Sequence, residues 1–205
     1  MLEETREAHG ILNMMEASGA LLAGHFALSS GLHSDKYIQC ALLLESPQRA
    51  EVVGRNLARL VEEAVGSGLI EVVVNPALGG LVIGHEVARA LGARCIFLER
   101  AAGTMTLRRG FRVGGRERVL VVEDVVTTGL STNEVIKVVS AQGADVIGVA
   151  AIVNRAANVD FGVPFVYLVR AEIANYEPAS CPLCKAGIPA VKLGSRDLGK
   201  GGGKP

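Results

Sequence analysis

The chain has 205 residues, of which 49% are hydrophobic, so it is long enough for one α/β domain with a buried core and a small appendage. Basic and acidic side chains both number 21, and the resulting net charge of zero gives no support for nucleic-acid binding, which usually shows a basic excess. No apolar run approaches the roughly 20 residues that span a membrane, and the polar start from Met1 to Gly10 is unlike a signal peptide.

The first 65 residues contain signals for two helices and a small sheet. Residues 3–18 place apolar side chains at helical spacing among polar ones, which predicts an amphipathic helix. Residues 24–40 are punctuated by Gly and Ser and are expected to form a small sheet or hairpin. Pro47 then begins a second helix, which extends to about residue 65, and Ser46 is its expected N-cap.

Short runs rich in Val and Ile follow from residue 70 and alternate with helical segments. Strands are expected at residues 71–75, 94–98, 118–123, 145–153 and 165–169, with helices that end near Leu91 and Gln142. This alternation predicts an α/β protein with a parallel sheet and helices on both faces. Residues 100–117 lack periodicity and predict a long mobile loop, and residues 197–205 predict a flexible tail.

Residues 119–132, VLVVEDVVTTGLST, form the most informative motif. An apolar strand leads into the carboxylates of Glu123 and Asp124, then into small hydroxyl residues and Gly129, and then into a helix. Main-chain N–H groups at a helix N-terminus can hold a phosphate, and a glycine lets the main chain approach it closely. The two acids follow the strand, where open α/β sheets bind ligands, and they suit ribose hydroxyls or a Mg²⁺ ion.

This motif differs from the common nucleotide-binding loops. It lacks the G-x-x-x-x-G-K-[ST] pattern with its lysine, and it lacks the G-x-G-x-x-G fingerprint. The alternative interpretation is an ordinary strand-to-helix turn in which the two acids are solvated caps.

Two further segments have the composition of anion-binding loops. Residues 76–80 (PALGG) join a strand to a helix, so their main-chain amides can hold an anion, although a packing turn is an alternative. Residues 99–112 contain four arginines against one glutamate. Guanidinium groups that close over an anionic ligand would stabilise its charge and exclude water, whereas the alternative is a solvated basic loop.

These segments together resemble the type I phosphoribosyltransferases. Residues 123–132 are similar to the phosphoribosyl-pyrophosphate motif of that family, and residues 75–80 (NPALGG) resemble its pyrophosphate loop. Residues 24–37 (GHFALSSGLHSDKY) are similar to the N-terminal signature of the orotate-specific members. Arg155 follows the strand after the motif, where the family places a base-binding arginine.

The resemblance implies a fold and a domain organisation. We expect the parallel-sheet type I phosphoribosyltransferase fold, in a single domain over residues 1–196. Its core would span about residues 45–170, and a small hood would be formed by N- and C-terminal segments, about 1–44 and 171–196.

The resemblance also implies roles for individual residues. The catalytic groups would be Glu123, Asp124, Arg100, Arg108 and Arg109. The 5-phosphate would bind at Thr127, Thr128, Gly129, Leu130, Ser131 and Thr132, and pyrophosphate at Leu78, Gly79 and Gly80. Orotate would contact Ser29, Lys36, Tyr37 and Arg155, and no side chain is expected to bind a metal ion directly.

The implied reaction transfers ribose 5-phosphate from phosphoribosyl pyrophosphate to orotate, giving orotidine 5-phosphate and pyrophosphate in pyrimidine synthesis. Mg²⁺ would be the cofactor, and a homodimer would let the 100–112 loop reach the neighbouring site. Neither a nucleic acid nor a membrane is an expected partner. The alternatives are a purine-base phosphoribosyltransferase, a non-catalytic regulator that senses phosphoribosyl pyrophosphate, and a flavodoxin-like binding module.

The cysteines and histidines carry a weaker signal. Four cysteines are too few for a disulfide scaffold, so we expect a protein of the reducing cytoplasm. Cys181 and Cys184 form a C-x-x-C pair, but a structural zinc site needs four ligands and no second pair is evident. We therefore expect a reduced, packed pair, and we expect His25 and His33 to be structural or surface residues.

Overall fold

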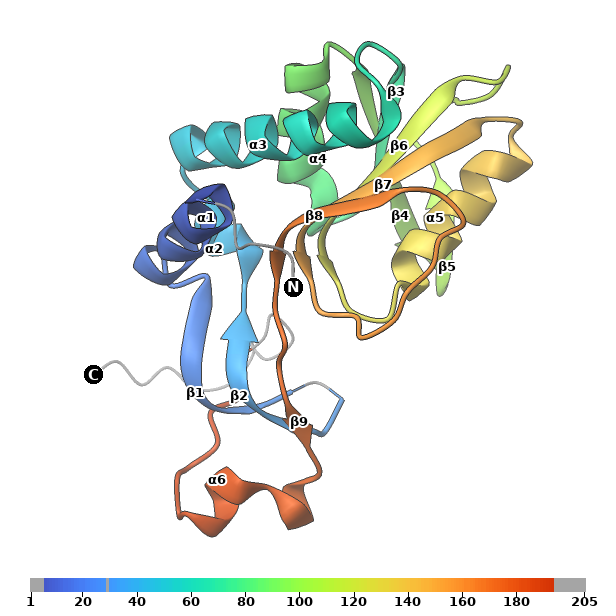
Figure 1. The fold of residues 1–205 in the computed structure, drawn as a ribbon. Coiled ribbons are helices and arrows are strands. Elements are labelled where there is room, and N and C mark those ends of the chain that lie inside the picture. The colour runs from blue at the N-terminus through green and yellow to red at the C-terminus, as the bar shows by residue number, and fades with distance from the viewer. Residues whose placement is uncertain (1–5, 29, 194–205) are drawn as a thin grey trace. The chain divides into compact units, whose positions relative to one another are not determined.

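The computed structural model of the protein describes residues 6–28 and 30–193 (Figure 1). The chain divides into two compact units: the larger consists of Met1–Ala20 and Gln39–Glu172, and the smaller of Leu21–Ile38 and Ile173–Pro205. Ser29 and the expected tail at 197–205 lie outside the described residues.

A six-stranded sheet forms the centre of the larger unit. Its strands lie in the order β5-β4-β3-β6-β7-β8, and every neighbouring pair is parallel except β4 with β5. The strands are β3 (Val72–Pro76), β4 (Arg94–Ala101), β5 (Thr104–Leu107), β6 (Arg118–Val126), β7 (Asp145–Asn154) and β8 (Phe165–Arg170). The expected central parallel sheet is thus confirmed, with an antiparallel strand at one edge.

Helices precede and alternate with these strands. They are α1 (Arg6–Ala17), α2 (Cys40–Leu44), α3 (Pro47–Val65), α4 (Gly80–Leu91) and α5 (Leu130–Ala141). The start of α3 agrees with the sequence because Ser46 Oγ accepts a hydrogen bond from Arg49 N at 3.4 Å, and Pro47 occupies the first position.

Helices cover both faces of this sheet, as expected. On one face, Val74 of β3 and Val121 of β6 share a buried cluster with Val135 of α5. Side chains alternate along a strand, so the equally buried Val73 points to the other face, where α4 contacts β3. Figure 1 shows α3 and α4 lying together, apart from α5.

Two expectations about the larger unit need correction. Residues 100–117 do not form one continuous loop, because β4 extends to Ala101 and pairs with β5, which leaves irregular chain only after Leu107. Helix α1 was expected in the hood, but it packs on α2, α3 and β8 of the larger unit. Its apolar side chains Ile11 and Met15 are 1% and 0% exposed, so it is part of that core.

The smaller unit contains the expected hairpin. Strands β1 (Leu21–Ala27), β2 (His33–Ile38) and β9 (Asn175–Tyr176) form an antiparallel sheet in the order β1-β2-β9. A 3₁₀ turn, η1 (Pro178–Ser180), and a short helix, α6 (Pro182–Lys185), follow β9. In the parts of both units that the structure describes, no helix combines the length and the apolar character needed to cross a membrane.

Candidate active site

Strand β6 carries two adjacent acids to the carboxyl edge of the sheet. Its residues Val119–Val122 are fully buried, and the strand continues beyond Glu123 and Asp124 to Val126. Helix α5 begins at Leu130, and its N-cap Gly129 has a φ of 75°, in the left-handed region. The acids and the N-terminus of α5 therefore belong to the same strand-to-helix connection, as the motif predicted.

The loop between β3 and α4 lies against Asp124. A Cβ atom on Gly79 would come within 2.6 Å of Asp124 Oδ1, closer than non-bonded atoms approach, so a side chain at this position would require the carboxylate to move. Leu78 is 82% exposed, and the Ala77–Leu78 peptide bond is cis. The structure thus brings the predicted pyrophosphate loop together with the acid pair of the phosphate motif.

Both acids have perturbed ionisation. Burial, and to a smaller extent the charge of Asp124, raise the pKa of Glu123 to about 9. Burial also raises the pKa of Asp124, whereas hydrogen bonds from the main-chain N–H groups of residues 124 and 125 lower it by a smaller amount. Across residues 6–28 and 30–193 neither acid forms an ion pair, and Glu123 Oε2 is buried without a partner. Unpaired buried carboxyl groups of this kind are typical of a functional site.

Asn75 is a site residue that the sequence analysis did not select. It is fully buried at the end of β3, and its Oδ1 accepts a hydrogen bond from the Cys95 thiol at 3.4 Å. Its Nδ2 has no partner within the described residues. A Cβ on Gly84 would lie 2.3 Å from Asn75 Oδ1, so α4 packs directly on this amide at the start of the pyrophosphate loop. In the sequence, this residue could have been selected because a polar amide directly follows three consecutive valines, Val72–Val74, of a predicted buried strand.

The predicted phosphate-binding turn is accessible. Thr127 and Thr128 are exposed, and Leu130 is 63% exposed. The first N–H groups of a helix have no acceptor within the helix, and at the start of α5 the Leu130 N–H donates to Thr128 Oγ1 at 3.4 Å. Thr132 is only 1% exposed, so its hydroxyl faces the interior.

Replacing Gly129 with alanine is expected to weaken binding of phosphoribosyl pyrophosphate at least about tenfold, measured by titration calorimetry, and to lower the unfolding free energy by about 1–3 kcal/mol. An alanine here would have to adopt the positive φ of 75°, and its Cβ would lie 2.8 Å from Val159 Cγ2. Gly143→Ala is the matched control, because Gly143 has a φ of 85° with nothing within 4 Å of the added Cβ. An equal loss of affinity in both variants would contradict a role for the Gly129 turn in binding.

The three arginines predicted to be catalytic are paired with acids. Arg100 forms an ion pair with Glu134 of α5, and its Nη1 donates to the Gly103 carbonyl at 2.7 Å. Arg109 Nε donates to Glu99 Oε1 at 2.7 Å, and Arg108 Nη1 lies 3.7 Å from Glu99 Oε2. Exposed ion pairs of this kind contribute only about 0–1 kcal/mol to the stability of the fold. These guanidinium groups can therefore leave the glutamate and bind a ligand phosphate instead.

Arg155 lies directly after β7 and is tied to the end of β6, since its N–H donates to the Val126 carbonyl at 2.8 Å. The side chain is half-buried, its Nε has no hydrogen-bond partner within the described residues, and burial lowers its pKa. A partly desolvated, unpaired guanidinium is well suited to a planar carboxylate ligand.

The other residues predicted to contact orotate belong to the smaller unit. Lys36 is exposed on β2, and the Tyr37 ring lies 5.6 Å from the Phe26 ring, centroid to centroid. Ser29 is outside the described residues. The roles of these three residues stay predictions.

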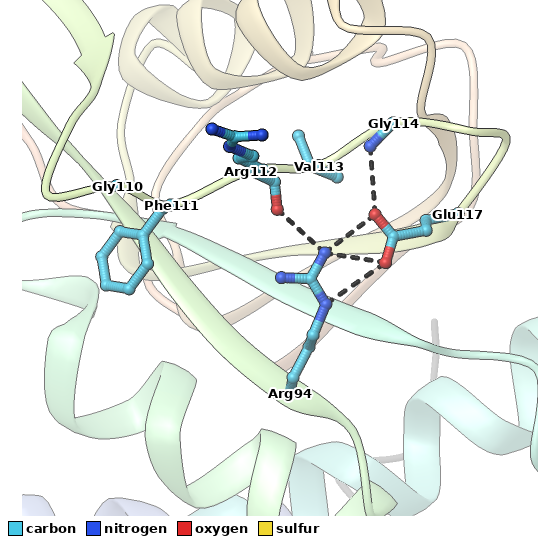
Figure 2. A pocket seen from close by; sticks show the side chains of 7 residues that line it. All are labelled: Arg94, Gly110, Phe111, Arg112, Val113, Gly114 and Glu117. Atoms are coloured by element: carbon cyan, nitrogen blue, oxygen red, sulfur yellow. Dashed lines mark hydrogen bonds and ion pairs between the residues drawn. The ribbon is translucent and has the colours of Figure 1, made fainter.

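Figure 2 shows a surface pocket formed around Arg94 and Glu117, with Arg112, Val113 and Gly114 in its rim. Arg94 Nη2 donates to Glu117 Oε1 at 2.7 Å and to the Arg112 carbonyl at 2.9 Å, so the pocket's polar groups satisfy one another. Arg94 begins β4 and Glu117 directly precedes β6. This pocket therefore lies at the amino edge of the sheet, opposite the acids of β6, and is not the candidate active site.

A mostly parallel open sheet whose carboxyl edge carries partly buried acids, a glycine-lined loop and a helix N-terminus is the arrangement with which α/β proteins bind phosphorylated ligands. The phosphoribosyl transferase domain family matches residues 41–163. The chain belongs to the phosphoribosyltransferase family, which confirms the resemblance seen in the sequence.

Related proteins are similar to this chain over nearly its full length. The orotate phosphoribosyltransferase of Thermotoga maritima is 51% identical over 189 residues, which cover 92% of this chain and 99% of that protein. The orotate phosphoribosyltransferase of Caldanaerobacter subterraneus is 49% identical over 193 residues, covering 94% and 100%. Among solved structures, the orotate phosphoribosyltransferase of Aeropyrum pernix superposes with a TM-score of 0.64 at 28% identity, covering 79% of this chain and 94% of that one.

Proposed function

We propose that the protein transfers ribose 5-phosphate from phosphoribosyl pyrophosphate to orotate, which gives orotidine 5-phosphate and pyrophosphate in pyrimidine synthesis. The observation that carries the proposal is the contact of Asp124 with the Gly79 loop, in a chain 51% identical to an orotate phosphoribosyltransferase. This contact puts a carboxylate for the sugar beside main-chain amides for the leaving group. The reducing cytoplasm is the proposed location.

In the proposed reaction an orotate nitrogen forms a bond to C1 of the ribose while the bond from C1 to the pyrophosphate oxygen breaks. Positive charge develops on the sugar ring and negative charge on the pyrophosphate. The carboxylate of Asp124 faces the sugar and stabilises the first charge, and Glu123 would join it in the ionised form that a bound divalent cation favours. The amides of residues 78–80 stabilise the second charge. The N-terminus of α5 holds the 5-phosphate and fixes the sugar between these groups.

The acid pair also fits a Mg²⁺ ion. Glu123 Oε2 is a buried oxygen without a partner, and both carboxyl groups have a raised pKa, so a divalent cation and sugar hydroxyls would satisfy and neutralise them. Glu123 and Asp124 would hold the ion, through water or through the hydroxyls of the substrate. The bound ion would supply positive charge that offsets the charge of the pyrophosphate.

Arg100, Arg108 and Arg109 are proposed to stabilise the departing pyrophosphate. Their exposed ion pairs with Glu99 and Glu134 keep the guanidinium groups positioned until a ligand of higher charge replaces the acid. We further propose a homodimer in which the 100–112 segment of one chain serves the site of the other. Sedimentation of the purified protein tests the dimer, and mixing an Arg109→Ala chain with an Asp124→Asn chain tests the exchange, since shared sites would recover part of the activity.

Replacing Arg155 with alanine is expected to raise the KM for orotate about 100-fold and to change the KM for phosphoribosyl pyrophosphate little, because a buried charge-assisted pair with the base would be lost. The Arg55→Ala variant, on the 69% exposed arginine side chain of α3, serves as the control. Steady-state kinetics with each substrate varied in turn measure both constants. An orotate KM within twofold of the unsubstituted enzyme would count against this role.

A pyrophosphate-release assay tests the proposal as a whole. The purified protein would be mixed with Mg²⁺ and phosphoribosyl pyrophosphate, and orotate, adenine, hypoxanthine and xanthine would be offered separately. Release with orotate alone is the expected result. Release with a purine base instead would favour a purine-specific enzyme, and tight binding of phosphoribosyl pyrophosphate without release from any base would favour a regulator.

A further inference from the structure

Four potential metal ligands meet in the smaller unit. His25 of β1, His33 of β2, Cys181 at the start of α6 and Cys184 within α6 place their ligand atoms within 4.8 Å of one another. Two of the four are almost fully buried, since His25 is 3% and Cys181 is 0% exposed. No step of the proposed transfer reaction uses any of them.

The hairpin register explains why the two histidines meet. His33 pairs with Ala27 across the β1–β2 ladder, and His25 lies two residues before Ala27 on the same strand. The β1–β2 ladder is irregular between Ala23 and Phe26, and at this bulge the His25 ring lies beside the His33 ring, with centroids 4.7 Å apart. His25 Nε2 and His33 Nδ1 are 2.8 Å apart.

The cysteines reach the same point from the C-terminal segment. Cys184 Sγ lies 3.3 Å from His33 Nδ1 and 3.8 Å from His25 Nε2, and Cys181 Sγ lies 3.5 Å from His25 Nε2. In a tetrahedral zinc site, with Zn–N near 2.0–2.1 Å and Zn–S near 2.3 Å, neighbouring N and S ligands stand roughly 3.6 Å apart. The three observed N···S distances bracket that value.

The orientation of His25 is fixed by its other ring nitrogen. His25 Nδ1 lies 2.7 Å from the Ile188 carbonyl oxygen, which can only accept, so Nδ1 carries the proton and donates. In the neutral imidazole this leaves the lone pair on Nε2, the nitrogen that faces both thiols and His33. A backbone carbonyl behind a metal-binding histidine is the usual means of setting its tautomer and direction.

The smaller unit also has little else to hold it together. In its described residues, 21–28, 30–38 and 173–193, only His25, Phe26, Ser34 and Cys181 are buried. A chain segment of this size buries too little apolar surface for stability on its own and commonly relies on a metal or a disulfide. A Zn²⁺ ion bound by two thiolates and two neutral imidazoles has no net charge, so it can be buried without a counter-ion.

We propose that His25, His33, Cys181 and Cys184 form a structural Zn²⁺ site that fastens the β1–β2 hairpin to the C-terminal segment. Four protein ligands complete a tetrahedron and leave no position for a substrate, so the role is structural. The expectation of a reduced cysteine pair without metal is replaced, because the second pair of ligands consists of histidines that precede the cysteines by about 150 residues in the chain.

Metal analysis of the tag-free protein, purified after growth with added zinc, is the first test. We expect about one zinc ion per chain that survives dialysis, and Co²⁺ substitution should give the visible absorption of a tetrahedral thiolate complex. Less than about a tenth of an equivalent of zinc, both as purified and after incubation of the folded protein with Zn²⁺, would overturn the proposal.

Matched variants identify the ligands, since the chain has two cysteines and two histidines outside the cluster. Cys184→Ser and His33→Ala should lower the zinc content at least about tenfold, whereas Cys95→Ser and His85→Ala should retain it. Cys184→His, which keeps a ligand at the position, should retain zinc as well. Equal zinc in all five variants would show an adventitious ion only. If a ligand variant fails to fold, the zinc content and Co²⁺ spectrum of the unsubstituted protein decide the question.

Discussion

Replacing Asp124 with asparagine is expected to lower kcat by about 100- to 1,000-fold, which corresponds to about 3–4 kcal/mol of lost transition-state stabilisation. Asparagine has the same shape but carries no negative charge to face the positive charge that develops on the ribose. The carboxylate lies directly against Gly79 of the predicted pyrophosphate loop. Steady-state production of pyrophosphate from orotate and phosphoribosyl pyrophosphate measures the effect.

The same variant should fold normally. Burial raises the pKa of Asp124, which means that the folded protein disfavours the charge, and an amide removes that cost. The thermal midpoint of Asp124→Asn should therefore equal or exceed that of the unsubstituted protein. Glu117→Gln is the control, because it makes the same chemical change at the opposite edge of the sheet and should leave kcat unaltered. A kcat of Asp124→Asn within about threefold of the original would remove Asp124 from the mechanism.

The second large effect concerns the pH dependence of stability through Glu123. In the folded protein the pKa of Glu123 is raised to about 9 from an ordinary value of 4.5, first by burial and then by Asp124. Below pH 4.5 the carboxyl is protonated in both folded and unfolded chains. Between pH 4.5 and about 9 the unfolded chain releases the proton that the folded chain retains, so the contribution of this group to stability falls as pH rises. The slope is at most about 1.4 kcal/mol per pH unit.

Glu123→Gln should remove this slope. Without ligand, the variant is expected to unfold at a higher temperature than the original protein at pH 8, and the difference should shrink toward pH 5. Thermal unfolding of both proteins at several pH values measures it, with Glu172→Gln, at an exposed position, as the control. Parallel stability curves for Glu123→Gln and the original protein would mean that Glu123 ionises normally in the folded state. The variant should also be less active, since stability gained at a buried charged site is commonly offset by lost function.

Local patterns in the sequence determined most of the larger unit. The valine runs at β3 and β6, the Ser46–Pro47 start of α3 and the alternation of strands with helices follow from backbone propensity and apolar periodicity, and each was predicted within a few residues. The strand–acid–acid–glycine motif likewise identified the family, because its chemistry is contained in one continuous segment. Strand β5 was missed, since its polar and apolar side chains alternate over only four residues, Thr104–Leu107, and form a strand by pairing with β4.

Only the tertiary structure decided which distant groups share an environment. The sequence cannot show that Gly79 lies against the Asp124 carboxylate, that Glu134 of α5 pairs with Arg100, or that α1 completes the larger core. Nor can it show that two histidines of an N-terminal hairpin meet a cysteine pair near the C-terminus. Side-chain identity fixes what a group can do, whereas the dielectric environment, pairing and coordination that decide what it does arise from long-range packing of the folded chain.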